Sequence, residues 1–176
     1  MTGVSDTRIS VEHRVQNVVD CPPGGECCYI LITPECLLHT QGGPRRVNHA
    51  AVAVGERIFS FGGYCTGDNY RDERPIDVFV LNTTTLRWTE IAKPTDPHLL
   101  SSWPYQRYGH TVVAAGDTCY LFGGRNDEAA CNLLFTFCTN TYQWTRPTVE
   151  GDIPGERDGH SAVIIGKIFR LSTKYR

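Results

Sequence analysis

Short apolar runs separated by polar turn residues dominate the chain from about residue 50 onward. Clear examples are 58–61, 78–81, 119–122 and 133–137. These runs are rich in Val, Ile, Phe, Tyr and Leu and are bounded by Gly, Asn or Pro, which is typical of short β-strands. No apolar period of 3.6 residues extends far enough to predict a useful helix. The pattern therefore predicts an all-β fold.

The runs belong to a unit that recurs along the chain. Each unit opens on an Arg-x-x-His motif, at 46–49, 107–110 and 157–160, and the first two units pass through a glycine pair to a closing tryptophan. A four-stranded sheet cannot bury both faces alone, so such units must stack, and radial stacking of four-stranded blades makes a β-propeller. We predict a partial propeller of two four-stranded blades plus part of a third. The recurring residues, to which we assign structural roles, are His49, His110, His160, Gly62, Gly63, Gly123, Gly124, Trp88 and Trp144.

Large apolar side chains in these runs should form the core, since burying one aromatic contributes on the order of 2–3 kcal/mol. The ten that we expect to be mostly buried are Phe59, Phe61, Val78, Val80, Trp88, Tyr120, Phe122, Leu133, Phe135 and Trp144.

The ordered series of Arg-x-x-His, glycine, aromatic strand, Gly-Gly, strand and Trp resembles the kelch repeat. The resemblance covers about residues 37–169. It divides the chain into an unassigned head at 1–36 that we expect to be disordered, a possible closing strand at 37–41, kelch repeat 1 at 42–91, an inter-blade loop at 92–106, kelch repeat 2 at 107–147, an incomplete kelch repeat 3 at 148–171 and an aberrant tail at 172–176. In the third unit the Gly-Gly positions fall on Thr173 and Lys174. We therefore expect the chain to be a fragment of a longer propeller, a splice product or a mispredicted gene model.

The resemblance implies a protein-binding function. Within the kelch family, the resemblance further implies a substrate-recognition component of a cullin-2 RING E3 ubiquitin ligase that reads C-terminal degrons. The segment that docks on the elongin–cullin-2 scaffold is expected beyond the blades, outside this chain. The alternative is an interaction scaffold, without ligase work, associated with chromatin or the cytoskeleton.

Composition narrows the possible partners and the compartment. The formal net charge is −2, which gives no electrostatic footprint for direct nucleic-acid binding, and no apolar run is long enough for a membrane span. The first residues carry no secretory signal pattern, so we expect a cytoplasmic or nuclear protein with free thiols. Cys21, Cys27, Cys28 and Cys36 form a cluster whose gaps differ from zinc-knuckle spacing; unpaired thiols and a metal site stay open as alternatives.

Candidate binding residues are those that differ between units while they hold loop positions beside the repeat motifs. Loops on a rigid scaffold carry binding groups, and Tyr and Arg are enriched at binding hot spots. The predicted partner-binding residues are Arg125, Asn126, Tyr64, Tyr108, Asn48 and Asp158, and 103–105 is a second candidate segment. Arg46, Arg107 and Arg157 could face a partner or fix the blades, and the recurring histidines could bind a metal or satisfy the core. No catalytic motif is present, so we expect no enzyme and no cofactor.

Overall fold

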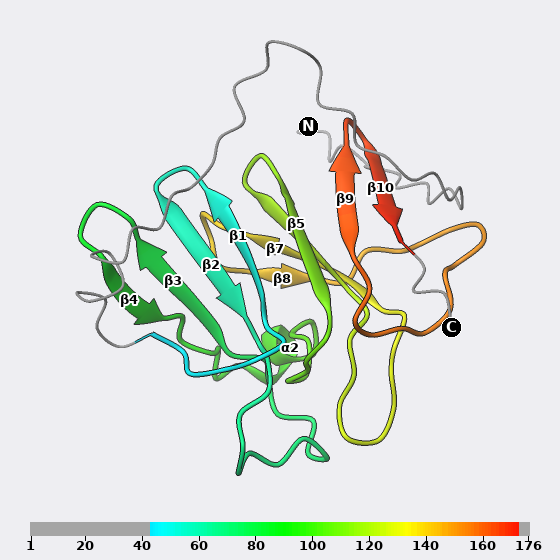
Figure 1. The fold of residues 1–176 in the computed structure, drawn as a ribbon, viewed down its shortest axis with the longest axis horizontal. Helices are drawn as coiled ribbons and strands as arrows, with labels where there is room; N and C mark the ends of the chain where they lie inside the picture. The colour runs from blue at the N-terminus through cyan, green and yellow to red at the C-terminus, as the bar shows by residue number, and fades with distance from the viewer. Residues whose placement is uncertain (1–42, 173–176) are drawn as a thin grey trace.

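The computed structural model describes residues 43–172 and contains the predicted blades (Figure 1). The predicted head at 1–36, the possible closing strand at 37–41 and most of the aberrant tail lie outside the described residues, as do the four clustered cysteines. The first sheet has the order β1-β2-β3-β4 and the second β5-β6-β7-β8, while β9 and β10 form a two-stranded third sheet. All pairs are antiparallel. The fold class predicted from the sequence is confirmed.

The strands are short, as the apolar runs require. Their bounds are β1 Ala50–Val54, β2 Arg57–Phe61, β3 Val78–Asn82, β4 Arg87–Glu90, β5 Thr111–Ala115, β6 Thr118–Phe122, β7 Leu134–Cys138, β8 Trp144–Thr145, β9 Ala162–Ile165 and β10 Ile168–Leu171. One helical turn, α2 at Pro97–Leu100, interrupts the pattern between the first two blades. Asp96 caps it by accepting a hydrogen bond from the His98 N–H, and Pro97 occupies its first turn. In the described part of the chain no helix is long and apolar enough to cross a membrane.

The three sheets stack through their faces, with the first strands β1, β5 and β9 next to one another (Figure 1). Phe59, Phe61 and Val78 of the first blade pack against Phe137 and Trp144 of the second. A smaller cluster of Phe122, Leu134 and Phe169 joins the second blade to the third. Stacking therefore buries the apolar face that each sheet leaves open.

The two recurring tryptophans lie in different surroundings. Trp144 is buried between the first two blades, with its ring centroid 4.9 Å from that of Phe137 and 5.7 Å from that of Phe61. Trp88 lies on the opposite face of the first blade, against Gly43, and is only half-buried. Of the ten predicted core residues, Phe59, Phe61, Val78, Phe122, Phe135 and Trp144 are buried, and Val80, Trp88, Tyr120 and Leu133 are half-buried.

Candidate functional site

The Gly-Gly pair of one blade docks onto the Arg-x-x-His motif of the next blade. The Gly63 N–H donates to the Arg107 carbonyl at 2.8 Å, and the Gly124 N–H donates to the Arg157 carbonyl at 2.9 Å. A Cβ atom on Gly62 would lie 2.7 Å from the Arg107 carbonyl oxygen. Only glycine allows this approach with its positive φ of 52°. The two repeated motifs are thus the two halves of one inter-blade joint.

The recurring histidines belong to the same joint. His110 Nε2 lies 3.1 Å from the Phe61 carbonyl oxygen, and burial lowers the pKa of His110 to about 3. His160 Nε2 lies 2.8 Å from Thr111 Oγ1, and burial lowers its pKa to about 4. Since low pKa values keep both rings neutral, they suit polar groups of the interior. His49, in the first unit, is exposed, and residues 43–172 contain no cluster of three His, Cys, Asp or Glu side chains placed to hold a metal.

The three recurring arginines have different partners. Arg107 is fully buried, donates to the carbonyls of Tyr105 and Gly123, and stacks on the Tyr105 ring with 3.9 Å from Cζ to the centroid. Arg157 donates to the Gly155 carbonyl and is half-buried. Arg46 instead pairs with Asp68 and Asp77. All three guanidinium groups therefore make their contacts with other residues of the same chain.

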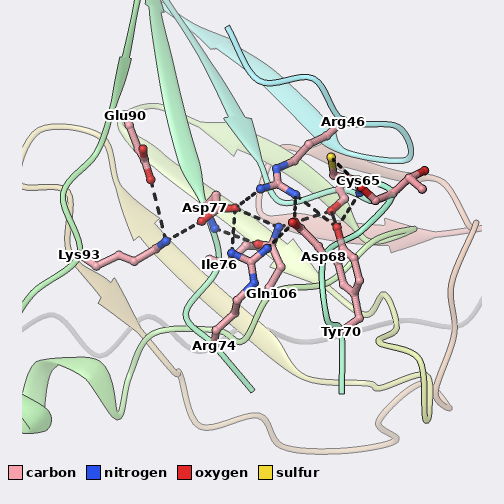
Figure 2. A network of polar contacts seen from close by, with 12 residues as sticks. Arg46, Cys65, Asp68, Tyr70, Arg74, Ile76, Asp77, Glu90, Lys93 and Gln106 are labelled. Carbon is pink, nitrogen blue, oxygen red and sulfur yellow. Dashed lines mark hydrogen bonds and ion pairs between the residues drawn. The ribbon is translucent and has the colours of Figure 1, made fainter. Parts of the chain in front are cut away.

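Asp77 is the centre of a charged network beneath the first blade (Figure 2). Its side chain is 6% exposed and pairs with Arg46 at 2.5 Å, Lys93 at 2.5 Å and Arg74 at 3.6 Å. Gln106 adds a hydrogen bond at 3.2 Å to the same carboxylate. Removing one member of a buried ion network leaves a charge unpaired, which is unfavourable. The ion pairs of Asp77 therefore hold the loop that follows Gly63 in place. The sequence pattern did not single out Asp77, because it occurs only in the first unit.

The loops after the glycine pairs project beyond the strand ends on one side of the molecule (Figure 1). Tyr64 forms a β-bridge with Val47, and Arg125 forms the equivalent bridge with Tyr108. Tyr64, Tyr70 and Tyr108 pack together with ring centroids 5.2–5.5 Å apart. We name Tyr64, Tyr108 and Arg125 the rim. Tyr70 supports the rim from below, since it is 1% exposed and its hydroxyl donates to the Gly63 carbonyl.

Charged groups of both signs surround Tyr108. Its hydroxyl lies 3.4 Å from Asp127 Oδ1, and burial is the main reason why its pKa is raised, with Arg125 opposing and Asp127 and Asp158 reinforcing the shift. Asp158 is exposed beside Gly109, as expected for a loop residue available to a partner. The rim therefore offers a guanidinium and two aromatic rings, with the carboxylates of Asp127 and Asp158 next to Tyr108.

Two predicted binding residues are placed differently from the expectation. Asn48 is equivalent to Gly109 and Gly159 rather than to Tyr108: all three have positive φ values, 53°, 67° and 59°, and the Gly109 N–H donates to the Asn48 carbonyl. Asn tolerates this conformation, so its position is set by the backbone joint. Asn126 is 9% exposed, and its Oδ1 accepts hydrogen bonds from the N–H groups of Glu128 and Ala129. It shapes the loop that carries Arg125.

The second candidate segment, 103–105, covers the core. Trp103 Nε1 donates to the Ile76 carbonyl at 3.0 Å, and Tyr105 pairs with Pro75 and lies under Arg107. Burial raises the pKa of Tyr105 to about 12. These contacts belong to the scaffold of the first two blades.

Comparison with known proteins is consistent with this geometry. The KLHDC2/KLHL20/DRC7 Kelch-repeats domain matches residues 46–171. The chain belongs to the kelch-repeat family. It is 52% identical over 141 residues to Kelch domain-containing protein 3 of Rattus norvegicus, covering 78% of this chain and 37% of that protein, and 53% identical to the Bos taurus protein of the same name over the same shares. It is 30% identical over 122 residues to Tip elongation aberrant protein 1 of Schizosaccharomyces pombe, covering 66% of this chain and 10% of that protein.

The kelch repeats of this chain are thus part of a β-propeller, a class of domain that mediates protein–protein interaction and is generally non-enzymatic. The chain spans little more than a third of the length of the mammalian relatives, 37%. The inter-blade joint explains why the glycine, arginine and histidine positions of the kelch unit recur: they make contacts between blades. The rim side chains are not needed for these contacts.

Proposed function

We propose that the rim of this kelch propeller binds an extended peptide segment of a protein partner. The observation that carries the proposal is the placement of Arg125 and Tyr108 across one β-bridge, with Tyr64 5.5 Å from Tyr108. The Arg125 Nε–H donates to the Asn126 carbonyl, which orients the guanidinium plane at the loop surface. Aromatic walls beside an arginine fork suit a peptide that ends in, or contains, a carboxylate.

We further propose that the whole protein is a substrate-recognition component of a cullin-2 RING E3 ubiquitin ligase that reads C-terminal degrons. Arg125 would pair with the terminal carboxylate of the peptide, and Asp158 would accept a hydrogen bond from a donor group next to that carboxylate. Capture of a peptide terminus by basic and backbone groups is an established mode of recognition. The proposal places the protein in the cytoplasm or the nucleus and assigns it no catalytic role of its own.

Two measurements on the full-length protein test this. Binding of fluorescein-labelled peptides should require a free C-terminal carboxylate, because amidation of the terminus removes the charge that pairs with Arg125. Purification from cells should recover elongins and cullin-2. If amidated peptides bind equally well, terminal recognition is excluded. If peptides bind but no elongin is recovered, the protein is an interaction scaffold of the chromatin or cytoskeletal kind instead.

A further inference from the structure

A second surface lies between the outer parts of the first two blades, away from the rim. There the sheets β1–β4 and β5–β8 diverge and leave a groove of about 840 Å³. Residues of the four-residue strand β4 and both residues of the short strand β8, Trp144–Thr145, line it. Its apolar floor consists of Val80, Ile91, Trp103 and Trp144. None of the rim residues lines it.

Two apolar side chains flank this floor in exposed positions. Leu99 in α2 is 48% exposed and Tyr142 in the β7–β8 turn is 37% exposed. Large exposed apolar side chains that border an apolar floor are typical of a contact surface for a partner. The volume also falls within the range of natural ligand sites, roughly 300–1,000 Å³.

The end of the groove near the strand turns is basic, while one acidic residue, Glu90, lines the groove farther along β4 and lies 3.9 Å from Lys93. Arg57, Asn82 and Arg87 are register partners across β2, β3 and β4, so their side chains form one row on the face that lines the groove. The Arg57 guanidinium donates to the Thr139 carbonyl and to Asn140 Oδ1, which anchors it at the second blade. Among residues 43–172, neither Arg57 nor Arg87 has a carboxylate within ion-pair distance, although other arginines of the first blade do. Two cations in one row without an acidic partner favour an anionic ligand.

We propose that this groove binds an acidic peptide segment of a protein partner, with apolar side chains on the floor and carboxylates at Arg57 and Arg87. Charge complementarity selects this occupant, because a purely apolar segment would leave both positive charges without an anionic partner at the contact. Within residues 43–172, β4 is also an edge strand of its sheet, so an extended chain can pair with its outer backbone groups. The site is independent of the rim and does not rest on its function.

The probe is a short fluorescein-labelled peptide that carries leucine and phenylalanine followed by a run of glutamates. A peptide with lysines in place of the glutamates is its counterpart. Fluorescence anisotropy with the full chain should show binding of the glutamate peptide that weakens as salt is added. Arg87→Glu should weaken that binding by at least about tenfold and improve binding of the lysine peptide, because charge reversal converts attraction into repulsion. Leu99→Ser should weaken binding of both peptides.

Arg71→Glu is the matched control, since Arg71 is exposed on the loop after Gly63 and does not line the groove. It makes the same change in net charge and should leave both affinities unchanged. An equal effect of Arg71→Glu and Arg87→Glu would overturn the proposal, as would absence of binding by wild type. A photocrosslinking amino acid at position 99 identifies the occupant: crosslinks to the glutamate peptide support the proposal. Crosslinks to a second copy of the chain or to residues 1–42 that persist at saturating peptide contradict it.

Discussion

His110 Nε2 of the second blade lies 3.1 Å from the carbonyl oxygen of Phe61 in the first. The contact spans 49 positions of the sequence and lies within the joint where Gly63 also meets the Arg107 carbonyl. A histidine, a glycine pair and an arginine carbonyl together fix how one blade docks on the next. A related joint connects the second blade to the third: the Gly124 N–H donates to the Arg157 carbonyl, and His160 Nε2 lies 2.8 Å from Thr111 Oγ1 instead of a carbonyl oxygen. Stability of the described blades should therefore depend on these small joints as well as on the core.

Gly62→Ala should destabilise the chain by about 2–4 kcal/mol, because the new Cβ would lie 2.7 Å from a backbone oxygen in addition to the strain of a positive φ. Gly55→Ala is the matched control. Gly55 has a similar φ of 57° but nothing within 4 Å of an added Cβ, so only the strain, about 1 kcal/mol, applies. Urea denaturation of both variants measures the difference. Equal losses would show that the joint is not tightly packed.

Acid should destabilise the fold through His110. Burial, helped by the charge of Arg107, lowers its pKa from 6.5 to about 3. Between these values the unfolded chain binds a proton that the folded chain does not, so the contribution of His110 is fully present above pH 6.5 and is lost as the pH falls toward 3. The unfolding free energy should decrease by up to about 1.4 kcal/mol per pH unit from this group.

His110→Gln should reduce that pH dependence, since glutamine does not titrate, and His160, whose pKa burial lowers to about 4, should contribute to the slope that remains. His49→Gln, at the exposed equivalent position, should retain the wild-type slope. Denaturation curves collected from pH 4 to pH 7 compare the three proteins. A slope in His110→Gln that equals the wild-type slope would assign the acid sensitivity to other groups.

Arg125→Ala should affect peptide binding, whereas Arg107→Ala should affect stability. Arg125 lies at the rim, and among residues 43–172 its side chain makes one hydrogen bond, to the Asn126 carbonyl. Its replacement by Ala should therefore weaken peptide binding by about 1–3 kcal/mol with a nearly unchanged melting temperature. Arg107 is fully buried and its removal should cost about 2–3 kcal/mol of stability, because two carbonyl contacts and the Tyr105 stack are lost. Affinity and melting temperature are measured for each variant. If Arg125→Ala unfolds the protein or leaves affinity intact, the rim assignment fails.

The cysteines of the second blade should differ in reactivity. Hydrogen bonds from the Thr141 side chain and from the backbone of Thr141 and Asn140 lower the pKa of Cys138, which is partly exposed. Burial raises the pKa of Cys119 to about 12. Because the thiolate is the reactive form, iodoacetamide should modify Cys138 well before Cys119 in the folded protein. Peptide mapping by mass spectrometry reads out both sites, and denaturant should abolish the difference.

The local pattern of the sequence was sufficient for the strands, the units and six of the ten expected core residues. Short apolar runs such as Ile58–Phe61, bounded by turn residues, identify the strands, and the glycine pairs mark backbone that a side chain would block. Both signals depend on neighbours a few positions away. For this reason β2, β6 and the buried Phe59, Phe61 and Phe122 were predictable.

Contacts between units were decided only by the tertiary structure. The Gly-Gly pair of one unit meets the Arg-x-x-His motif of the next, so two motifs that look like separate signatures in the sequence form one joint. Asn48 illustrates the consequence: its positive φ groups it with Gly109, while its polarity suggested a binding residue. Asp77 corresponds in position to Leu133, and the second unit has no tyrosine in its loop after Gly124, so repetition did not point to Tyr70 or Asp77. Side chains that support the rim depend on the three-dimensional path of such loops, and the spacing of residues along the chain does not encode that path.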